Sequence, residues 1–229
     1  MNPSDSLFKT WLRFLTFRFK FEDYQRLGHR HLVAGILGCW IVGMGRYWDD
    51  PRANWLQLGG VGSVAYIFAL ALLLWLIVKP IAPRRFSYLG ILTLVAMTSP
   101  PAILYAIPVE KWMTLAAANQ LNLLFLGIVA LWRLALWVHY LCEWGLFVGG
   151  MTFVGAALPL AVIFISLIEL NLHHVIVDIM GGIREADRSS QDAAYGALWL
   201  FSLLVVPVSC FAGLGWIYIL IDNWRQKSN

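Results

Sequence analysis

Residues 61–78 read VGSVAYIFALALLLWLIV, a run of eighteen residues without a charged side chain. A helix needs about 20 predominantly apolar residues to cross the hydrocarbon core of a bilayer, which is about 30 Å thick. This stretch and its flanking residues therefore predict a membrane-spanning helix. The composition agrees, because 60% of the 229 residues are hydrophobic and only 13% are charged, whereas soluble domains carry about 25% charged residues.

The rest of the chain extends this pattern. Four further stretches are uncharged and long enough to span, namely residues 88–107, 112–132, 144–168 and 193–221. Residues 32–45 form a shorter sixth candidate, and Arg30 and Arg46 at its ends are expected to reach toward the two interfaces. The predicted fold class is all-α, a polytopic transmembrane helical bundle of about six spans at residues 31–48, 58–79, 88–108, 112–138, 144–170 and 193–222.

The distribution of basic residues predicts the orientation of these spans. Cytoplasmic loops of membrane proteins carry an excess of Lys and Arg. With six spans and both termini inside, twelve of the seventeen basic residues lie on the cytoplasmic side and five on the other. We expect a multi-pass protein of a bacterial inner (plasma) membrane, whose net charge of +4 reflects this bias rather than nucleic-acid binding.

Residues 1–30 precede the transmembrane domain of residues 31–229 and predict an amphipathic helix over residues 4–27. Its apolar stripe has helical spacing and consists of Phe8, Leu12, Leu15 and Phe19. Basic residues follow a neighbouring stripe, an arrangement that suits the anionic headgroup region. Two placements remain open, namely a helix that lies on the membrane surface and a helix packed on the protein's own cytoplasmic face.

The third span contains a backbone break at Ser99-Pro100-Pro101. Two prolines remove two backbone donors and push the preceding residue away from helical geometry. Transporters build substrate sites on broken helices, but proline kinks also occur in membrane helices that transport nothing. The break is therefore compatible with either a binding site or a simple kink.

Polar residues in the next span are candidates for transport or proton relay. Asn119, Gln120 and Asn122 begin this span and could form interhelical hydrogen bonds with the broken helix. Arg133 lies near its end. It is expected to contact an anion, to form a buried ion pair, or to extend to the interface beside a tryptophan.

A second group of ionisable residues follows the fifth span. Glu169 and His173 are four residues apart, and so are His174 and Asp178, so each pair shares a helix face. This spacing is compatible with a metal site built from all four residues, with a proton relay through Glu169 and His173, or with hydrated side chains among the headgroups.

Features of residues 98–144 provide a family resemblance. They are Ser99-Pro100-Pro101, then Ile107-Pro108, and then Leu131-Trp132-Arg133 in the following helix. In these features the chain resembles the bacterial form of the Yip family of polytopic membrane proteins, although the Asp-Leu-Tyr-Gly-Pro motif of the eukaryotic members is absent from the sequence. The resemblance implies a scaffold or trafficking-type membrane protein without catalytic residues.

Three function hypotheses follow. The first is a non-enzymatic scaffold or subunit of a membrane complex, with the lipid bilayer and other membrane proteins, or a second copy of the chain, as partners. The second is a small transporter or channel that uses the broken third helix, and the third is an intramembrane metalloprotein. The sequence contains no Walker loop, dinucleotide fingerprint, His-Glu-x-x-His motif or nucleophile elbow. An enzyme is therefore the less favoured reading, and no cofactor is assigned.

Overall fold

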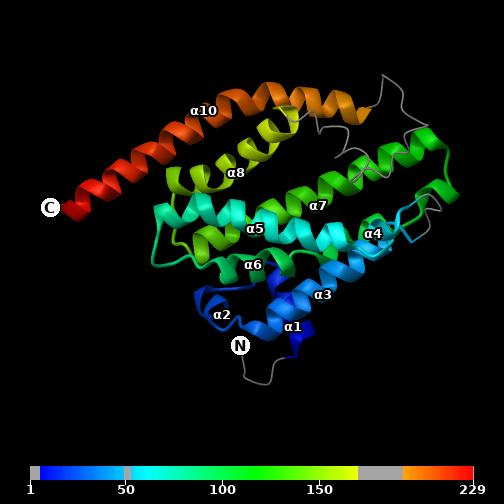
Figure 1. Ribbon diagram of the computed structural model, residues 1–229, viewed down its shortest axis with the longest axis horizontal. Helices are drawn as coiled ribbons and strands as arrows, with labels where there is room; N and C mark the ends of the chain where they lie inside the picture. Colours follow the sequence, from blue (N-terminus) through cyan, green and yellow to red (C-terminus); the bar gives the residue numbers. More distant parts are fainter. Residues whose placement is uncertain (1–5, 49–52, 170–192, 229) are drawn as a thin grey trace.

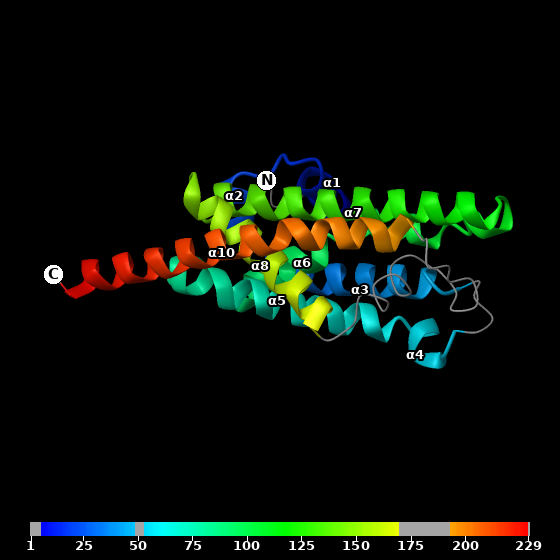
Figure 2. The ribbon, with the colours of Figure 1, turned by 90° about the horizontal axis from the view of Figure 1, so that it is seen from above.

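The computed structural model describes residues 6–48, 53–169 and 193–228. Every regular element in these ranges is helical, which confirms the all-α prediction. The elements are α1 (Leu7–Leu15), α2 (Phe21–Gln25), α3 (His29–Gly45), α4 (Trp55–Leu58), α5 (Val61–Ile81), α6 (Tyr88–Met97), η1 (Pro100–Ala106), η2 (Val109–Lys111), α7 (Leu115–Glu143), α8 (Gly150–Glu169) and α10 (Ala193–Ser228). Figures 1 and 2 show the longer helices side by side along the long axis, with the carboxyl end of α10 extending past the others.

Two helices among the described residues are long and apolar enough to cross a membrane. They are α5 and the Gln120–Glu143 part of α7. A third span results if α6 and η1, which are bent by 44° relative to each other, count as one broken span. Residues Gly150–Ser166 of α8 are apolar but shorter. The structure therefore supports a membrane location with two or three candidate spans.

Helix α6 lies at the centre of the bundle. Every residue from 91 to 99 is buried, and α3 and α5 both pack against the helix. Gly35 of α3 allows a close approach, because a Cβ atom at that position would lie 2.8 Å from the Cβ of Ala96. Small residues let neighbouring membrane helices come this near. Residues 91–99, which lead into the break, are therefore enclosed by neighbouring helices.

The N-terminal segment differs from the single helix expected over residues 4–27. Helix α1 begins where the Ser6 side chain accepts a hydrogen bond from the Lys9 amide at 3.2 Å. It ends at Leu15, because the chain then turns through Phe17 with a φ of 58°. A non-glycine residue rarely adopts this left-handed conformation, so the turn separates α1 from the short helix α2.

An ion pair links the two N-terminal helices. Arg13 Nη2 of α1 donates to Asp23 Oδ2 of α2 at 2.9 Å, and the Asp23 side chain is only 6% exposed. The backbone amide of Lys20 donates to the same carboxylate oxygen at 3.2 Å.

Tyr24, the residue that follows Asp23, is also buried. Burial raises the pKa of its hydroxyl, and the nearby Tyr140, Glu143 and Asp23 raise it further.

The N-terminal segment is docked on the bundle. The Trp132 indole of α7 donates to the Leu15 carbonyl at 3.1 Å, and His139 Nε2 lies 2.9 Å from the carbonyl oxygen of Phe19. Trp132 lies eleven residues before the end of α7, which corresponds to about 16 Å along the helix. Helix α1 therefore packs beside the middle of the bundle, while Phe8 and Leu12 on its other side are 76% and 53% exposed.

Tryptophan side chains also tie α8 and α10 to the bundle. The Trp137 indole of α7 donates to the Gly155 carbonyl of α8 at 2.9 Å. The Trp216 indole of α10 donates to the Ile77 carbonyl of α5 at 2.9 Å. Each bond reaches a backbone carbonyl on another helix, so the tryptophans hold neighbouring helices together through polar as well as apolar contacts.

Candidate functional site at the broken third helix

The two prolines create the break by a simple mechanism. In a continuous helix, the amides of residues 100 and 101 would donate to the carbonyls of Ala96 and Met97. Proline has no amide hydrogen, so both carbonyls lose their helical partners. The backbone bends by 44° and continues as the 3-10 helix η1. Because this region is buried, the freed carbonyls need other donors.

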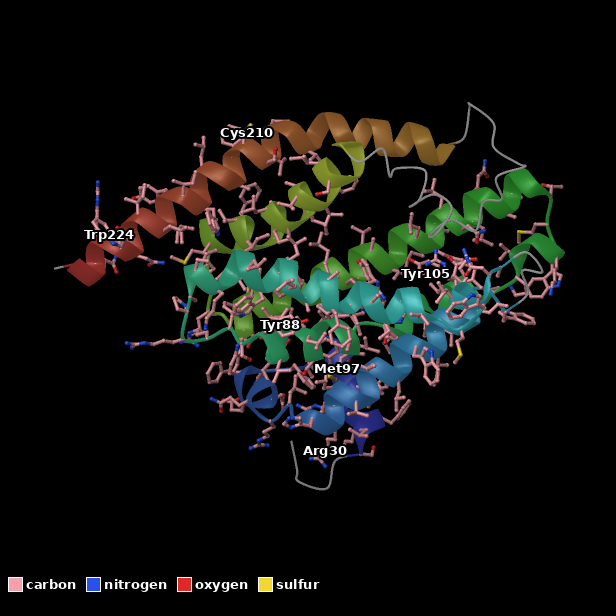
Figure 3. All side chains as sticks on the ribbon, in the orientation of Figure 1. Arg30, Tyr88, Met97, Tyr105, Cys210 and Trp224 are labelled. Carbon is pink, nitrogen blue, oxygen red and sulfur yellow. The ribbon has the colours of Figure 1, made fainter. Side chains whose placement is uncertain are left out.

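Two donors supply the freed carbonyls, and a third donor reaches the carbonyl that follows them. Ser99 donates to the Ala96 carbonyl through its own hydroxyl at 2.8 Å. The Trp11 indole of α1 donates to the Met97 carbonyl at 2.6 Å. At the next carbonyl, that of Thr98, the donor is Arg133 Nε of α7 at 3.4 Å. Helices α1 and α7 therefore converge on the break. Figure 3 labels Met97, whose carbonyl accepts the hydrogen bond from Trp11.

A second arginine lies near the same break. Arg46 directly follows α3, and its guanidinium lies over two aromatic rings, 5.5 Å from the ring centroid of Tyr47 and 5.2 Å from that of Tyr105 in η1. Its Nη2 atom is enclosed and has no hydrogen-bond partner among the described residues. The Tyr105 hydroxyl is also enclosed without a partner. Figure 3 labels Tyr105 at the η1 side of the break.

The two arginines contact different parts of the broken segment. Arg133 donates to the Thr98 carbonyl just before η1, and Arg46 lies over the Tyr105 ring within η1. No carboxylate in the described part of the chain forms an ion pair with either arginine. We call Arg46, Tyr105 and Arg133 the arginine cluster.

The two arginines lie at different positions along their helices. Arg133 is ten residues before the end of the 29-residue helix α7, about 15 Å along its axis. Arg46 directly follows the 17 residues of α3, about 25 Å from the start of that helix. Arg133 therefore lies within its helix, and Arg46 lies at the end of its own.

Sequence reasoning identified only part of this site. Arg133 was a candidate residue, and the structure places it at the break. The expectation that Arg46 extends outward to the interface stays a prediction, and the structure adds that its Nη2 atom is enclosed near the Tyr47 and Tyr105 rings. The sequence feature that indicates a contact between Arg46 and an aromatic ring is the pair Arg46-Tyr47 directly after an apolar helix. Nothing in the sequence pairs Arg46 with Tyr105, because that contact depends on the direction in which η1 leaves the break.

The predicted amide cluster lies away from the break. Asn119, Gln120 and Asn122 occupy the first turns of α7, and Gln120 is exposed. Asn122 precedes Arg133 by eleven residues, about 16 Å along the helix. The side chain of Asn119 lies outside what the structure describes. The structure therefore gives no support for grouping these amides with the Thr98 carbonyl in one site.

The predicted metal or proton-relay residues lie at the edge of the described structure. Glu169 ends α8, but its side chain is outside the described part. His173, His174 and Asp178 are also outside it, so this prediction stays untested. Within the described ranges, no group of three or more His, Cys, Asp or Glu side chains could hold a metal ion.

Comparisons with known proteins provide no family assignment. No family model, curated protein or solved structure matches the chain. The function is therefore argued from the geometry of the chain itself.

Proposed function

We propose that this chain is a small integral membrane transporter that binds its solute at the break between α6 and η1. The observation that carries the proposal is the arginine cluster. Two guanidinium groups and an unpaired tyrosine hydroxyl lie beside the broken helix without a counter-charge in the described residues. Ionisable groups within membrane spans commonly mark substrate or ion pathways, and broken helices commonly form the binding sites of transporters.

The membrane arrangement that we propose has six spans with both termini in the cytoplasm. Helical segments occupy all six expected ranges, namely α3, α5, α6 with η1, α7, α8 and α10. In this arrangement the exposed Phe8 and Leu12 of α1 contact lipid, and the opposite face of the same helix contacts the bundle through Trp11 and Phe14. Helix α1 then combines the two placements that the sequence left open.

A scaffold or subunit of a membrane complex is the second candidate function. It is favoured by the exposed apolar face of α10, where Phe211, Leu214 and Tyr218 are 72%, 66% and 72% exposed. Lipid or another membrane protein would cover such a face equally well. A scaffold does not account for two guanidinium groups beside the broken helix that form no ion pair with a described carboxylate, so we rank it second. The resemblance to the Yip family, which would favour a scaffold, remains untested.

Solute flux tests the proposal. The purified chain is reconstituted into liposomes, and uptake is measured for a panel of small anions, cations and neutral solutes. We expect uptake of at least one solute by the wild type and by Arg84→Gln, which removes an exposed arginine outside the bundle interior. Arg133→Gln should abolish that uptake while the variant still inserts and keeps its helical content. Absence of flux for the whole panel, with correctly inserted wild-type protein, would favour the scaffold.

A further inference from the structure

One face of helix α3 packs inside the bundle. Gly35, Cys39 and Gly43 recur every four residues and are buried. A Cβ atom at Gly35 would lie 2.8 Å from the Cβ of Ala96 in α6. The Cys39 thiol donates to the Ser63 carbonyl of α5 at 3.4 Å. Helices α5 and α6 therefore occupy this face of α3.

The opposite face of α3 is apolar and exposed, and it begins with an arginine. Val33, Leu37 and Ile41 follow Arg30 at intervals of three, four and four residues, a spacing that places all four on one side of a helix. Arg30 is in the first turn of α3, and all four residues are exposed. Figure 3 labels Arg30 on the outside of the bundle. We call Arg30, Val33, Leu37 and Ile41 the outer face of α3.

The outer face of α3 has the length of one membrane leaflet. Eleven residues separate Arg30 from Ile41, about 16 Å along the helix at 1.5 Å per residue. Half of the hydrocarbon thickness of a bilayer is about 15 Å. A phospholipid whose phosphate group meets Arg30 would therefore lay its acyl chains along the three apolar residues as far as the middle of the bilayer.

The charges around Arg30 favour an anionic lipid over a zwitterionic one. Arg26 and Arg30 are both exposed, and residues 26–30 contain no acidic side chain. Asp23, the acidic residue nearest in sequence, is buried and paired with Arg13 at 2.9 Å. Basic residues next to a membrane span attract anionic lipids. Phosphatidylglycerol carries a net negative charge and phosphatidylcholine carries none, so the first should be preferred.

We propose that the outer face of α3 binds one anionic phospholipid, with the phosphate group at Arg30 and the acyl chains along the three apolar residues. A guanidinium group can donate two parallel hydrogen bonds to phosphate oxygens, which fixes the headgroup as well as attracting it. This inference rests on the proposed arrangement of the spans, in which α3 crosses the membrane. It does not rest on transport.

Lipid selectivity is measured on the delipidated full-length protein in detergent. Native mass spectrometry follows incubation with an equal mixture of phosphatidylglycerol and phosphatidylcholine. We expect each chain to retain one phosphatidylglycerol in preference to phosphatidylcholine. Arg30→Gln should reduce this preference about fivefold, because one basic residue near an anionic surface contributes about that factor. Arg84→Gln is the matched control, since it removes the same charge from an exposed arginine between α5 and α6, and it should leave the preference unchanged.

Two further variants separate the headgroup contact from the acyl-chain contact. Arg30→Lys keeps the charge but loses the guanidinium fork, so its preference for phosphatidylglycerol should lie between those of Arg30→Gln and the wild type. Leu37→Ala removes apolar contact, so it should weaken retention of both lipids without changing the preference between them. Circular dichroism checks that each variant keeps its helical content.

Three results would overturn the inference. One is equal retention of the two lipids by the wild-type protein, and another is a preference that Arg30→Gln leaves unchanged. The third is a dimer that retains no lipid, because a second copy of the chain would then cover the outer face of α3. The two proposals can be separated. Lipid preference without flux would leave the lipid site standing and remove the transporter, and flux without lipid preference would do the reverse.

Discussion

The indole nitrogen of Trp11 donates a hydrogen bond of 2.6 Å to the carbonyl oxygen of Met97, 86 residues further along the chain. Pro101 deprives that carbonyl of its helical partner. Helix α1 is thus held to the bundle at the point where the third span breaks. The N-terminal segment is part of the packing around the site, and it does not simply cover the ends of the helices.

Trp11→Phe should destabilise the protein by about 1–3 kcal/mol, because it leaves the buried Met97 carbonyl without its donor. The phenyl ring keeps part of the apolar contact, so the change isolates the hydrogen bond. Unfolding in detergent, followed by circular dichroism, measures the effect. Trp55→Phe is the matched control, since Trp55 is 76% exposed. Equal stability of the two variants would show that the Met97 carbonyl does not need the indole.

Arg13 and Asp23 should be strongly coupled. Removing the guanidinium by Arg13→Gln leaves a nearly buried carboxylate with fewer donors, a change that commonly costs about 3–5 kcal/mol when the pair is buried. Arg13 is partly exposed, at 28% of its side chain, so we expect a smaller loss. Limited proteolysis between α1 and α3 should become faster in Arg13→Gln and Asp23→Asn, but not in the exposed control Arg18→Gln. A double variant whose loss equals the sum of the single losses would argue against the ion pair.

Replacement of two glycines by alanine should change the stability of the protein in opposite directions. Gly35→Ala would place a Cβ atom 2.8 Å from the Ala96 Cβ and close to its backbone, so it should push α3 away from α6. Overpacking of this kind costs about 1–3 kcal/mol. Gly127→Ala in α7 meets nothing within 4 Å and should stabilise the helix by up to about 1 kcal/mol. Thermal unfolding of both variants in the same detergent tests this, and a neutral Gly35→Ala would refute the close packing of α3 on α6.

The amide cluster at the start of α7 should not participate in solute uptake. Gln120 lies thirteen residues before Arg133, about 20 Å along the helix, and its side chain is exposed. Gln120→Leu should therefore leave solute uptake into liposomes unchanged, whereas Arg133→Gln abolishes it. A tenfold loss of uptake in Gln120→Leu would mean that the site extends along α7 toward the predicted amide cluster.

Apolar periodicity and proline chemistry account for most of what the sequence predicts correctly. The helical fold follows from uncharged runs such as residues 61–78, and the bend of the third span follows from Pro100 and Pro101. The division of the N-terminal segment at Phe17 was missed, because Phe8 and Leu12 continue a regular stripe and no glycine or proline marks the turn. The distant donors at the break were also missed. Trp11 reaches the Met97 carbonyl and Arg133 reaches the Thr98 carbonyl only when distant helices pack together.

The most direct test of the account is solute uptake by liposomes that contain the wild-type protein or the Arg133→Gln variant. The proposed site at the broken helix predicts uptake of at least one solute by the wild type and by Arg84→Gln, and none by Arg133→Gln. Equal uptake by the wild type and Arg133→Gln, both folded and inserted, would contradict the assignment of the broken third helix as the binding site.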